Sequence, residues 1–304
     1  MRIIRPITVT PDDLGSDVLT DSNVAEADYS EYSSGTSYST GNRVILTDTG
    51  YHRIYESLAN SNSNNYPPDN PDKWLDVSAT NRWKMFDGVT SNVTSNSTSI
   101  EVDLTPGEVV NAVALFNLSA ESVDIVMDDP TDGEVYNQSF DLTDNSAVVD
   151  WYAYFFESIT RKTDLAVFDL PAYSTAVITI TITQTGGTAE CGQVVLGRYV
   201  QIGTTEWGAT AGIIDYSIKN TDSFGNAYLL QRKFSKRATF DVIVEHPSAW
   251  VHRLLAQYRA TPLAWIGASD DDYDITIIYG FYRDFSILLE HVAWSVCSIE
   301  VEGL

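Results

Sequence analysis

The clearest structural signal in this chain is the stretch Ala176-Val177-Ile178-Thr179-Ile180-Thr181-Ile182-Thr183, in which isoleucine alternates with threonine. A period of two places every second side chain on the same face of a β-strand, so the isoleucines predict a buried face. Gly186-Gly187 follows as a turn, and residues 191–202 are expected to return as the next strand. This hairpin predicts a β-sheet in the middle of the chain.

The strand pattern extends back from this hairpin to Asn81. Residues 99–104 alternate apolar with polar side chains, and further strand-like runs lie at 109–117, 123–127, 134–142, 151–156 and 165–170. About eight strands with turns every 8–12 residues and no helical period are typical of a β-sandwich or jelly roll. We therefore predict a jelly-roll domain over residues 80–203, in which the aromatic run 151–156 is one of the strands.

The last hundred residues contain the one convincing helical pattern. Pro247 suits a first helical turn and Pro262 ends the segment, while the apolar positions between them share one helix face: Trp250, Val251, Leu254, Leu255 and Tyr258. Strand-like runs flank the helix at 212–219, 227–233, 238–244, 263–267, 274–279, 285–289 and 292–302. We predict a C-terminal α+β domain over residues 204–304, with one helix on a sheet.

Two shorter segments are expected before the jelly roll. Residues 3–10 are β-branched around Pro6, and because proline cannot donate to a central ladder they predict an extended arm or an edge strand within an N-terminal arm, 1–23. Residues 24–79 predict a small β domain with short strands at 43–46, 51–55 and 73–77 and a polar loop at 60–72. The whole chain is therefore expected to be mainly β and multidomain.

Charge excludes several classes of partner. The chain has 304 residues, with 18 Lys and Arg against 42 Asp and Glu, and a formal charge of −24. Such a balance argues against nucleic-acid binding and against adsorption to an anionic membrane. No apolar run is long enough to span a bilayer and no signal-peptide pattern opens the sequence, so we expect a soluble protein made inside the cell. Cys191 and Cys297 are expected to be buried free thiols.

The charge is also unevenly spread along the chain. Residues 1–150 carry a net charge of −18, whereas residues 151–304 carry −6. Four basic residues of the second half fall within six positions: Arg232, Lys233, Lys236 and Arg237. In an acidic protein such a cluster favours a docking or salt-bridge patch over a nucleic-acid site.

Catalytic and metal-binding patterns are weak. There is no Gly-x-Ser-x-Gly motif, no Gly-rich phosphate loop between strand and helix, and no metal-ligand spacing around the four histidines His52, His246, His252 and His291. Acidic clusters at 128–134 and 270–274 lack the spaced ligand pattern of a calcium loop and suit turns better. We therefore expect no enzymatic activity, no cofactor and no metal.

Aromatic side chains in the small domain offer a different chemistry. A sugar ring packs its apolar C–H face on Tyr or Trp while polar neighbours bind its hydroxyls, and the stretch 38–74 combines rings with Asn, Ser and Asp. The candidate carbohydrate-binding residues are Tyr38, Tyr51, Tyr55 and Trp74. The competing interpretation is that these rings form the core of a domain with little other apolar material, and for any single ring it is favoured.

Three resemblances follow from these residues. Tyr38, the turn Gly41-Asn42-Arg43-Val44, Tyr51, Ile54-Tyr55, Pro67-Pro68 and Lys73-Trp74 make residues 32–77 similar to the small chitin-type carbohydrate-binding modules of families 5 and 12, although Tyr32 stands where many of those modules begin with Trp. Residues 80–203, opening Asn81-Arg82-Trp83-Lys84-Met85-Phe86-Asp87-Gly88, resemble the galactose-binding-like jelly roll. The final hundred, with Tyr279-Gly280-Phe281-Tyr282-Arg283-Asp284-Phe285-Ser286 and the ending Ser298-Ile299-Glu300-Val301-Glu302-Gly303-Leu304, resemble a widespread tail protein of tailed bacteriophages.

Together these resemblances imply a structural component of a bacteriophage virion, synthesised in the host cytoplasm and placed at the tail tip or baseplate. Its partners would be other tail proteins and further copies of itself in a ring, joined by strand addition at the C-terminal domain, and host-surface glycan contact stays open. The alternatives are a free-standing lectin or adhesin, a glycan-cleaving enzyme, and a capsid or collar decoration protein.

Overall fold

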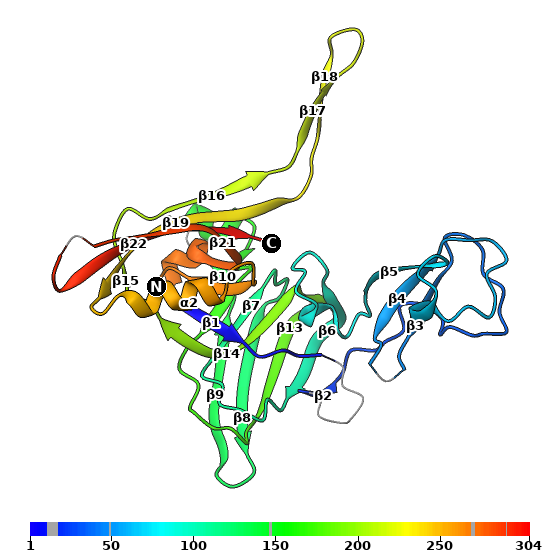
Figure 1. The fold of residues 1–304 in the computed structure, drawn as a ribbon, viewed down its shortest axis with the longest axis horizontal. Coiled ribbons are helices and arrows are strands. Elements are labelled where there is room, and N and C mark those ends of the chain that lie inside the picture. Colours follow the sequence, from blue (N-terminus) through cyan, green and yellow to red (C-terminus); the bar gives the residue numbers. More distant parts are fainter. Residues whose placement is uncertain (11–17, 49, 146–147, 269–270, 290) are drawn as a thin grey trace. The chain divides into compact units, whose positions relative to one another are not determined.

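The computed structural model describes residues 1–10, 18–48, 50–145, 148–268, 271–289 and 291–304 (Figure 1). They fall into two compact units, one made of Met1–Pro6 with Leu196–Leu304 and the other of Ile7–Val195. Most of the regular structure in both units is β-strand. The prediction of a mainly β chain with a small β module, a sandwich and a C-terminal α+β part is confirmed.

The unit Ile7–Val195 is organised around β13 (Val177–Cys191), which contains the alternating stretch. In this sheet the order is β2 (Leu19–Ser22), β6 (Thr94–Leu104), β13, β8 (Ser122–Asp129) and β9 (Gly133–Asp141). Ile180 stands opposite Val102 of β6 and Ile125 of β8, and all three side chains are buried. The isoleucine face of β13 is therefore an inner face of the core, as the alternation predicts.

A second group of strands in this unit contains one strand that is buried throughout. β7 (Ala112–Phe116) pairs with β12 (Leu165–Val167), and every residue of β7 is buried. Next to β7 lies β14 (Gln193–Gln201), along which the chain leaves this unit. A run of consecutive buried residues such as Ala112–Phe116 is typical of a strand covered on both faces.

The small module forms its own sheet of β3 (Arg43–Leu46), β4 (Arg53–Ser57) and β5 (Trp74–Ala79). The polar loop between β4 and β5 carries a short 3-10 helix, η1 (Pro67–Asp69), and a second one, η2 (Lys84–Phe86), follows β5. All three strands lie within a few residues of their predicted positions.

The predicted strand at residues 151–156 is wrong. This segment forms the short helix α1 (Trp151–Phe156), which lies in the sequence between β10 (Thr143–Asp144) and β11 (Thr160–Arg161), two strands paired only with each other. Aromatic residues favour strands on average, but this run has no alternation of apolar and polar residues, and without that period the composition alone does not specify a strand.

The other unit contains a large antiparallel sheet. From β14 the order is β1 (Arg2–Pro6), β20 (Leu263–Ile266), β21 (Ile277–Leu288), β22 (Trp294–Gly303), β19 (Phe234–Glu245) and β15 (Thr204–Thr205), and β16 (Thr210–Asp215) also pairs with β19. Another 3-10 helix, η3 (Asp271–Thr276), precedes β21.

The predicted helix is confirmed as α2 (Ala249–Gln257), which follows β19. Val251, Leu254 and Leu255 are buried in a cluster with Phe240 and Trp265 of the sheet. The carbonyl of Leu255 also accepts a hydrogen bond of 2.9 Å from the hydroxyl of Tyr282 in β21. Trp250, predicted on the same apolar face, is partly exposed. Among the described residues no helix is long and apolar enough to cross a bilayer.

The interpretation of the N-terminal residues as an arm or edge strand is wrong. β1 pairs with β14 on one side and with β20 on the other, and Ile3 and Ile4 are fully buried. Pro6 is the last residue of the strand, so its missing N–H falls where the ladder ends rather than inside it. The strand pairs with residues almost two hundred positions or more away, and local sequence carries no sign of such pairing.

A two-stranded hairpin extends from the end of this sheet (Figure 1). It consists of β17 (Ile218–Thr221) and β18 (Ala227–Leu230), between β16 and β19 in the sequence. We call residues 216–233 the arm. The strand predicted at 212–219 is divided between β16 and this hairpin, and the strand predicted at 227–233 forms β18 over its first four residues.

Replacing one inward isoleucine tests the assignment of the β13 face. Ile180→Ala is expected to lower the free energy of unfolding by about 2–5 kcal/mol because it leaves a cavity in a closely packed core. Thr181→Ala, one residue along and on the opposite face, is expected to change it by less than about 1 kcal/mol. Urea denaturation followed by tryptophan fluorescence measures both, and equal losses would contradict the assignment.

Candidate functional site

Most of the predicted carbohydrate-binding rings form the core of the small module. Tyr38, Tyr55 and Trp74 are buried together with Val44 and Leu46, and Trp74 is only 2% exposed. The rings of Tyr38 and Trp74 meet edge to face with centroids 5.2 Å apart. The indole N–H of Trp74 donates a 2.9 Å hydrogen bond to the carbonyl of Asn65, which ties the polar loop to the sheet.

This burial corrects the interpretation of the four residues as one sugar platform. A ring enclosed by protein has no face to offer a ligand, so Tyr38, Tyr55 and Trp74 act as core residues, the alternative that the sequence favours for any single ring. Tyr51 is different because it is 39% exposed. It is the one candidate of the four that retains a ring surface in contact with solvent.

Tyr51 has a partner that the candidate set leaves out. The ring of Tyr66 meets it nearly at a right angle with centroids 6.4 Å apart, and the Tyr66 hydroxyl lies 3.5 Å from Oδ2 of Asp48. Partial burial raises the pKa of Tyr66, and the Asp48 carboxylate raises it further. The phenol therefore stays protonated at neutral pH, and the pair combines apolar ring surface with a hydroxyl and a carboxylate.

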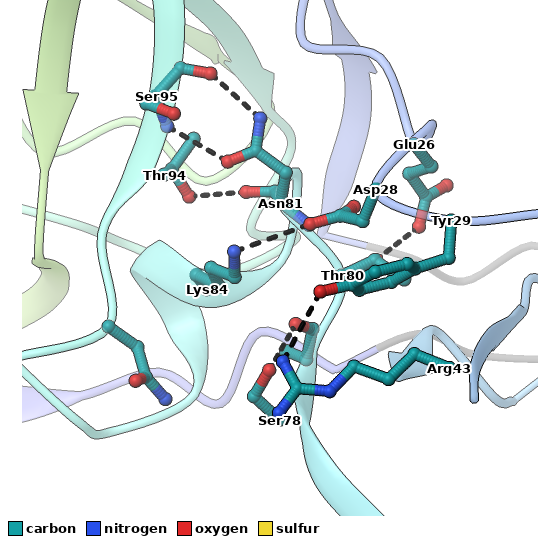
Figure 2. A network of polar contacts seen from close by, with 12 residues as sticks. Glu26, Asp28, Tyr29, Arg43, Ser78, Thr80, Asn81, Lys84, Thr94 and Ser95 are labelled. Atoms are coloured by element: carbon teal, nitrogen blue, oxygen red, sulfur yellow. Dashed lines mark hydrogen bonds and ion pairs between the residues drawn. The ribbon is translucent and has the colours of Figure 1, made fainter. Parts of the chain in front are cut away.

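A network of polar contacts joins the segment before the small module to the segment after it (Figure 2). Oε1 of Glu26 accepts a hydrogen bond from the Thr80 hydroxyl at 2.5 Å and lies 2.7 Å from Nδ1 of His52. Oε2 of Glu26 lies 3.3 Å from Nη1 of Arg82. Asp28 accepts from the backbone N–H of Asn81 at 2.9 Å and pairs with Lys84 at 3.3 Å.

Asn81 extends this network into the sandwich. Its side chain donates to the carbonyl of Ser95 at 2.7 Å and accepts from the N–H of Ser95 at 3.0 Å, and its own carbonyl accepts from Thr94. Residues 81–84 belong to the stretch that resembles the opening of a galactose-binding-like domain. Here Asn81 bonds to the strand β6, while Arg82 and Lys84 pair with Glu26 and Asp28 ahead of the small module.

Glu26 is ionised within this network. Burial by itself would raise the pKa of its carboxyl, but hydrogen bonds from His52 and Thr80 and the positive charge of Arg82 outweigh burial and lower the pKa. Its side chain is 8% exposed, so the paired charge is largely withdrawn from water. A buried carboxylate of this kind stabilises a fold only while its partners remain in place.

The four basic residues proposed as a docking patch do not share one surface. Arg232 and Lys233 follow β18 in the arm and are exposed, whereas Lys236 and Arg237 are consecutive in β19 and therefore point to opposite faces of the strand. Arg237 stands opposite Glu302 of β22. The structure thus places two of the four on the arm and two within the sheet.

Other sequence candidates take structural roles. Asp129 accepts hydrogen bonds from the backbone N–H groups of Thr131 and Asp132 and from the hydroxyl of Thr175, as expected of a turn. The second acidic cluster, residues 270–274, lies partly outside the described residues. Within the described part of the chain no group of His, Cys, Asp and Glu is arranged to hold a metal.

The two cysteines are buried free thiols, as predicted. Burial raises the pKa of Cys191 to about 12 and that of Cys297 to about 11, so neither is a reactive thiolate at neutral pH.

A cavity of about 520 Å³ lies elsewhere in the same unit as Cys297, lined in part by residues 203–209, Phe240 and Ile266. None of the site residues predicted from the sequence lines it.

Comparison with known proteins assigns the chain to no family. No protein-family model matches the chain, and no curated protein sequence matches it. The lectin domain of lectinolysin complexed with Lewis b antigen matches at 18% identity and a TM-score of 0.27, over 38% of this chain and 83% of that one. A histidine mutant of the same lectin domain, also with Lewis b, matches at 18% identity and a TM-score of 0.28, over 40% and 84%. Scores this low do not show a common fold.

The Glu26 network gives a pH-dependent expectation. The pKa of Glu26 is lower in the folded state than in the unfolded state. The ionised carboxylate therefore stabilises the fold at a pH above the unfolded-state pKa of about 4.3. This stabilisation is lost as the pH falls through the folded-state pKa. Glu26→Gln is expected to lower the free energy of unfolding by about 1–3 kcal/mol at pH 7, and by less as the pH falls below about 4.

The matched control is Glu56→Gln, which removes the exposed pair of Glu56 with Arg43 at 2.8 Å. An exposed pair contributes less than about 1 kcal/mol, so this variant is expected to change stability little. Denaturant titrations of both variants between pH 3 and pH 8 measure the difference, and a Glu26→Gln effect independent of pH would contradict the assigned ionisation.

Proposed function

We propose that this chain is a structural component of a bacteriophage virion, located at the tail tip or baseplate, which acts by assembling with other subunits. The observation that carries the proposal is the arm, a hairpin whose apolar side chains are exposed. Phe224 at its tip is 89% exposed and Leu229 is 78% exposed, and Ile218, Tyr228 and Leu230 are exposed as well.

Such a hairpin has little to stabilise it in an isolated chain. Two strands without a covering layer are marginal in water, and contiguous exposed apolar side chains usually mark a contact surface. The tip is nevertheless well defined, because the Asp222 carboxylate accepts 2.8 Å hydrogen bonds from the backbone N–H groups of Phe224 and Asn226. An arm of this construction suits contact with a neighbouring subunit.

The resemblance of the last hundred residues to phage tail proteins supports the same proposal. The stretch 279–286 lies in β21 and the ending 298–303 in β22, and the two strands pair directly. Gly280 stands opposite Gly303, and a Cβ on Gly280 would lie only 2.0 Å from the carbonyl oxygen of Glu302. The glycine of the resembling stretch is thus required by a close approach of two backbones at the centre of the sheet.

On this proposal the chain performs no catalytic step, and its partners are tail proteins and further copies of itself. The direct test is to locate the chain within the intact particle. Antibody raised against the purified chain is expected to label one end of particles isolated from lysates in which the chain is naturally produced, and a reconstruction of those particles is expected to contain the sheet of β1 and β19–β22. Absence from intact particles, or labelling of the capsid or collar, would contradict the proposal.

A second role, contact with a glycan, is favoured by the Tyr51–Tyr66 pair. The two rings, with Asp48 beside them, supply the apolar face and the polar groups that a sugar requires. Sites this small are weak singly and gain from display of many copies, which a virion provides.

A glycan array tests this second role. Binding by the full chain is expected, with Tyr51→Ala weakening it at least about tenfold because the exposed ring is lost. Tyr29→Ala is the matched control, since Tyr29 is an equally exposed tyrosine of the same module whose hydroxyl is held by Arg43. No binding by the unaltered chain, or equal losses in the two variants, would remove the glycan role and leave the assembly role untouched.

A further inference from the structure

The helix α1 exposes an unusual amount of aromatic surface. Five of its six residues are aromatic, and their exposed fractions run from 65% to 78%: Trp151, Tyr152, Tyr154, Phe155 and Phe156. We call these five residues the aromatic cluster. A helix that is apolar on all sides is ordinarily buried, so the exposure of this one points to a surface that is covered in the functional assembly.

The size of the cluster matches that of a specific interface. An aromatic side chain has roughly 150–250 Å² to bury, so five rings at these exposed fractions offer roughly 700 Å². A stable protein–protein contact buries about 800 Å² on each partner. The cluster alone therefore supplies most of one side of a standard interface.

The rings of the cluster contact one another. Trp151 stacks on Phe155 with centroids 6.2 Å apart, Tyr152 lies 4.9 Å from Phe156, and Tyr154 meets Phe155 edge to face at 5.1 Å. These pairs fix the orientation of the side chains before any partner arrives. The surface is thus preorganised, which lowers the entropy cost of covering it.

The cluster lies in an acidic stretch of the sequence and in an acidic unit. Asp150 and Glu157 flank the helix directly, and no lysine or arginine occurs between Lys84 and Arg161. The unit that contains α1, residues 7–195, has 29 acidic and 7 basic residues and so carries a net charge of −22. A partner for this surface is expected to be apolar where it meets the rings and basic around them.

The arm has this combination. Residues 216–233 contain three basic residues and one acidic residue, which gives a net charge of +2 in a chain of −24. Ile218 stands opposite Leu230 and Asn220 opposite Tyr228, so in this antiparallel pair Ile218, Leu230 and Tyr228 share one face. Arg232 and Lys233 follow that face directly in the chain and are exposed.

We propose that the arm of one copy of this chain docks on the aromatic cluster of a second copy. The inference rests on the proposed function and names the contact by which copies join. The apolar face of the hairpin covers the rings of α1, while the basic residues at the base of the arm lie against the acidic surroundings of the cluster. Because the two surfaces differ, the contact is heterologous, and repetition of it produces a ring or an open chain of subunits.

The charges argue against two other occupants. Pairing of two aromatic clusters face to face would bring together two units of charge −22, which repel each other. Insertion of the rings into a membrane would place the same acidic unit against phosphate headgroups, which are anionic in most biological membranes. The arm of a second copy offers apolar surface and positive charge at once.

Photo-cross-linking tests the contact in the full chain. A copy carrying p-benzoylphenylalanine in place of Tyr228 is mixed with unaltered ¹⁵N-labelled chain and irradiated. Cross-links between the two isotopic forms are expected to map to the peptide 151–157. The same probe in place of Val292, which is also highly exposed but lies between β21 and β22, is expected to give no such product.

Sedimentation of the purified chain supplies the second measurement. The unaltered chain is expected to self-associate, with Leu230→Ser on the docking face of the arm and Tyr152→Ser in the cluster each raising the dissociation constant by about tenfold or more. Val292→Ser is the matched control and is expected to leave it unchanged. Added salt is expected to weaken association, because it screens the attraction between the arm and the acidic unit.

Several outcomes would overturn the inference. The first is a chain that stays monomeric at concentrations on the order of 100 μM. The second is that cross-links form only within one isotopic form. The third is that residues 151–156 bind phosphatidylcholine vesicles while the chain does not self-associate. The proposed function is judged separately by the presence of the chain in particles. If particles contain the chain but the probe at position 228 does not cross-link to 151–157, the inference is wrong and the proposed function stands. If the cross-link forms in solution but the chain is absent from particles, the proposed function is wrong and the contact between copies stands.

Discussion

The sandwich depends on the alternation of isoleucine and threonine in β13, because this strand pairs with β6 on one side and β8 on the other. Ile178, Ile180 and Ile182 face inward, and at each position both neighbouring strands place an apolar residue opposite. A shift of one residue would turn all of these side chains to the wrong face, so the register is strongly specified. The register in turn fixes where the connections leave the sheet, including the one that carries α1.

Elements with a regular period were predictable from the sequence. The β13 alternation and the helix α2 each repeat a pattern several times, and each lies close to its predicted position. β1 was not predictable as a central strand because its partners, β14 and β20, lie far away in the sequence, and Pro6 suggests an edge until its place at the end of the strand is known. Local sequence specifies the strand but not its neighbours.

The aromatic residues show a different limit. Rings are equally suited to a core and to a binding surface, so residue type alone does not distinguish the two. Tyr38, Tyr55 and Trp74 are buried because a module of about fifty residues has few other large side chains to enclose, whereas the run 151–156 has no polar face and no sheet to join, and remains exposed. The glycan candidate Tyr51 and its partner Tyr66 could be found as residue types, but their pairing depends on how the polar loop folds back.

Charge then decides which of the exposed apolar surfaces can meet. A chain of −24 keeps free copies apart, which limits indiscriminate association through the arm and the aromatic cluster. The arm is locally positive and the unit bearing α1 is strongly negative, so contact between unlike surfaces is favoured while contact between like surfaces is opposed. The same acidic residues that maintain solubility therefore also impose a direction on assembly: arm to cluster, and not cluster to cluster.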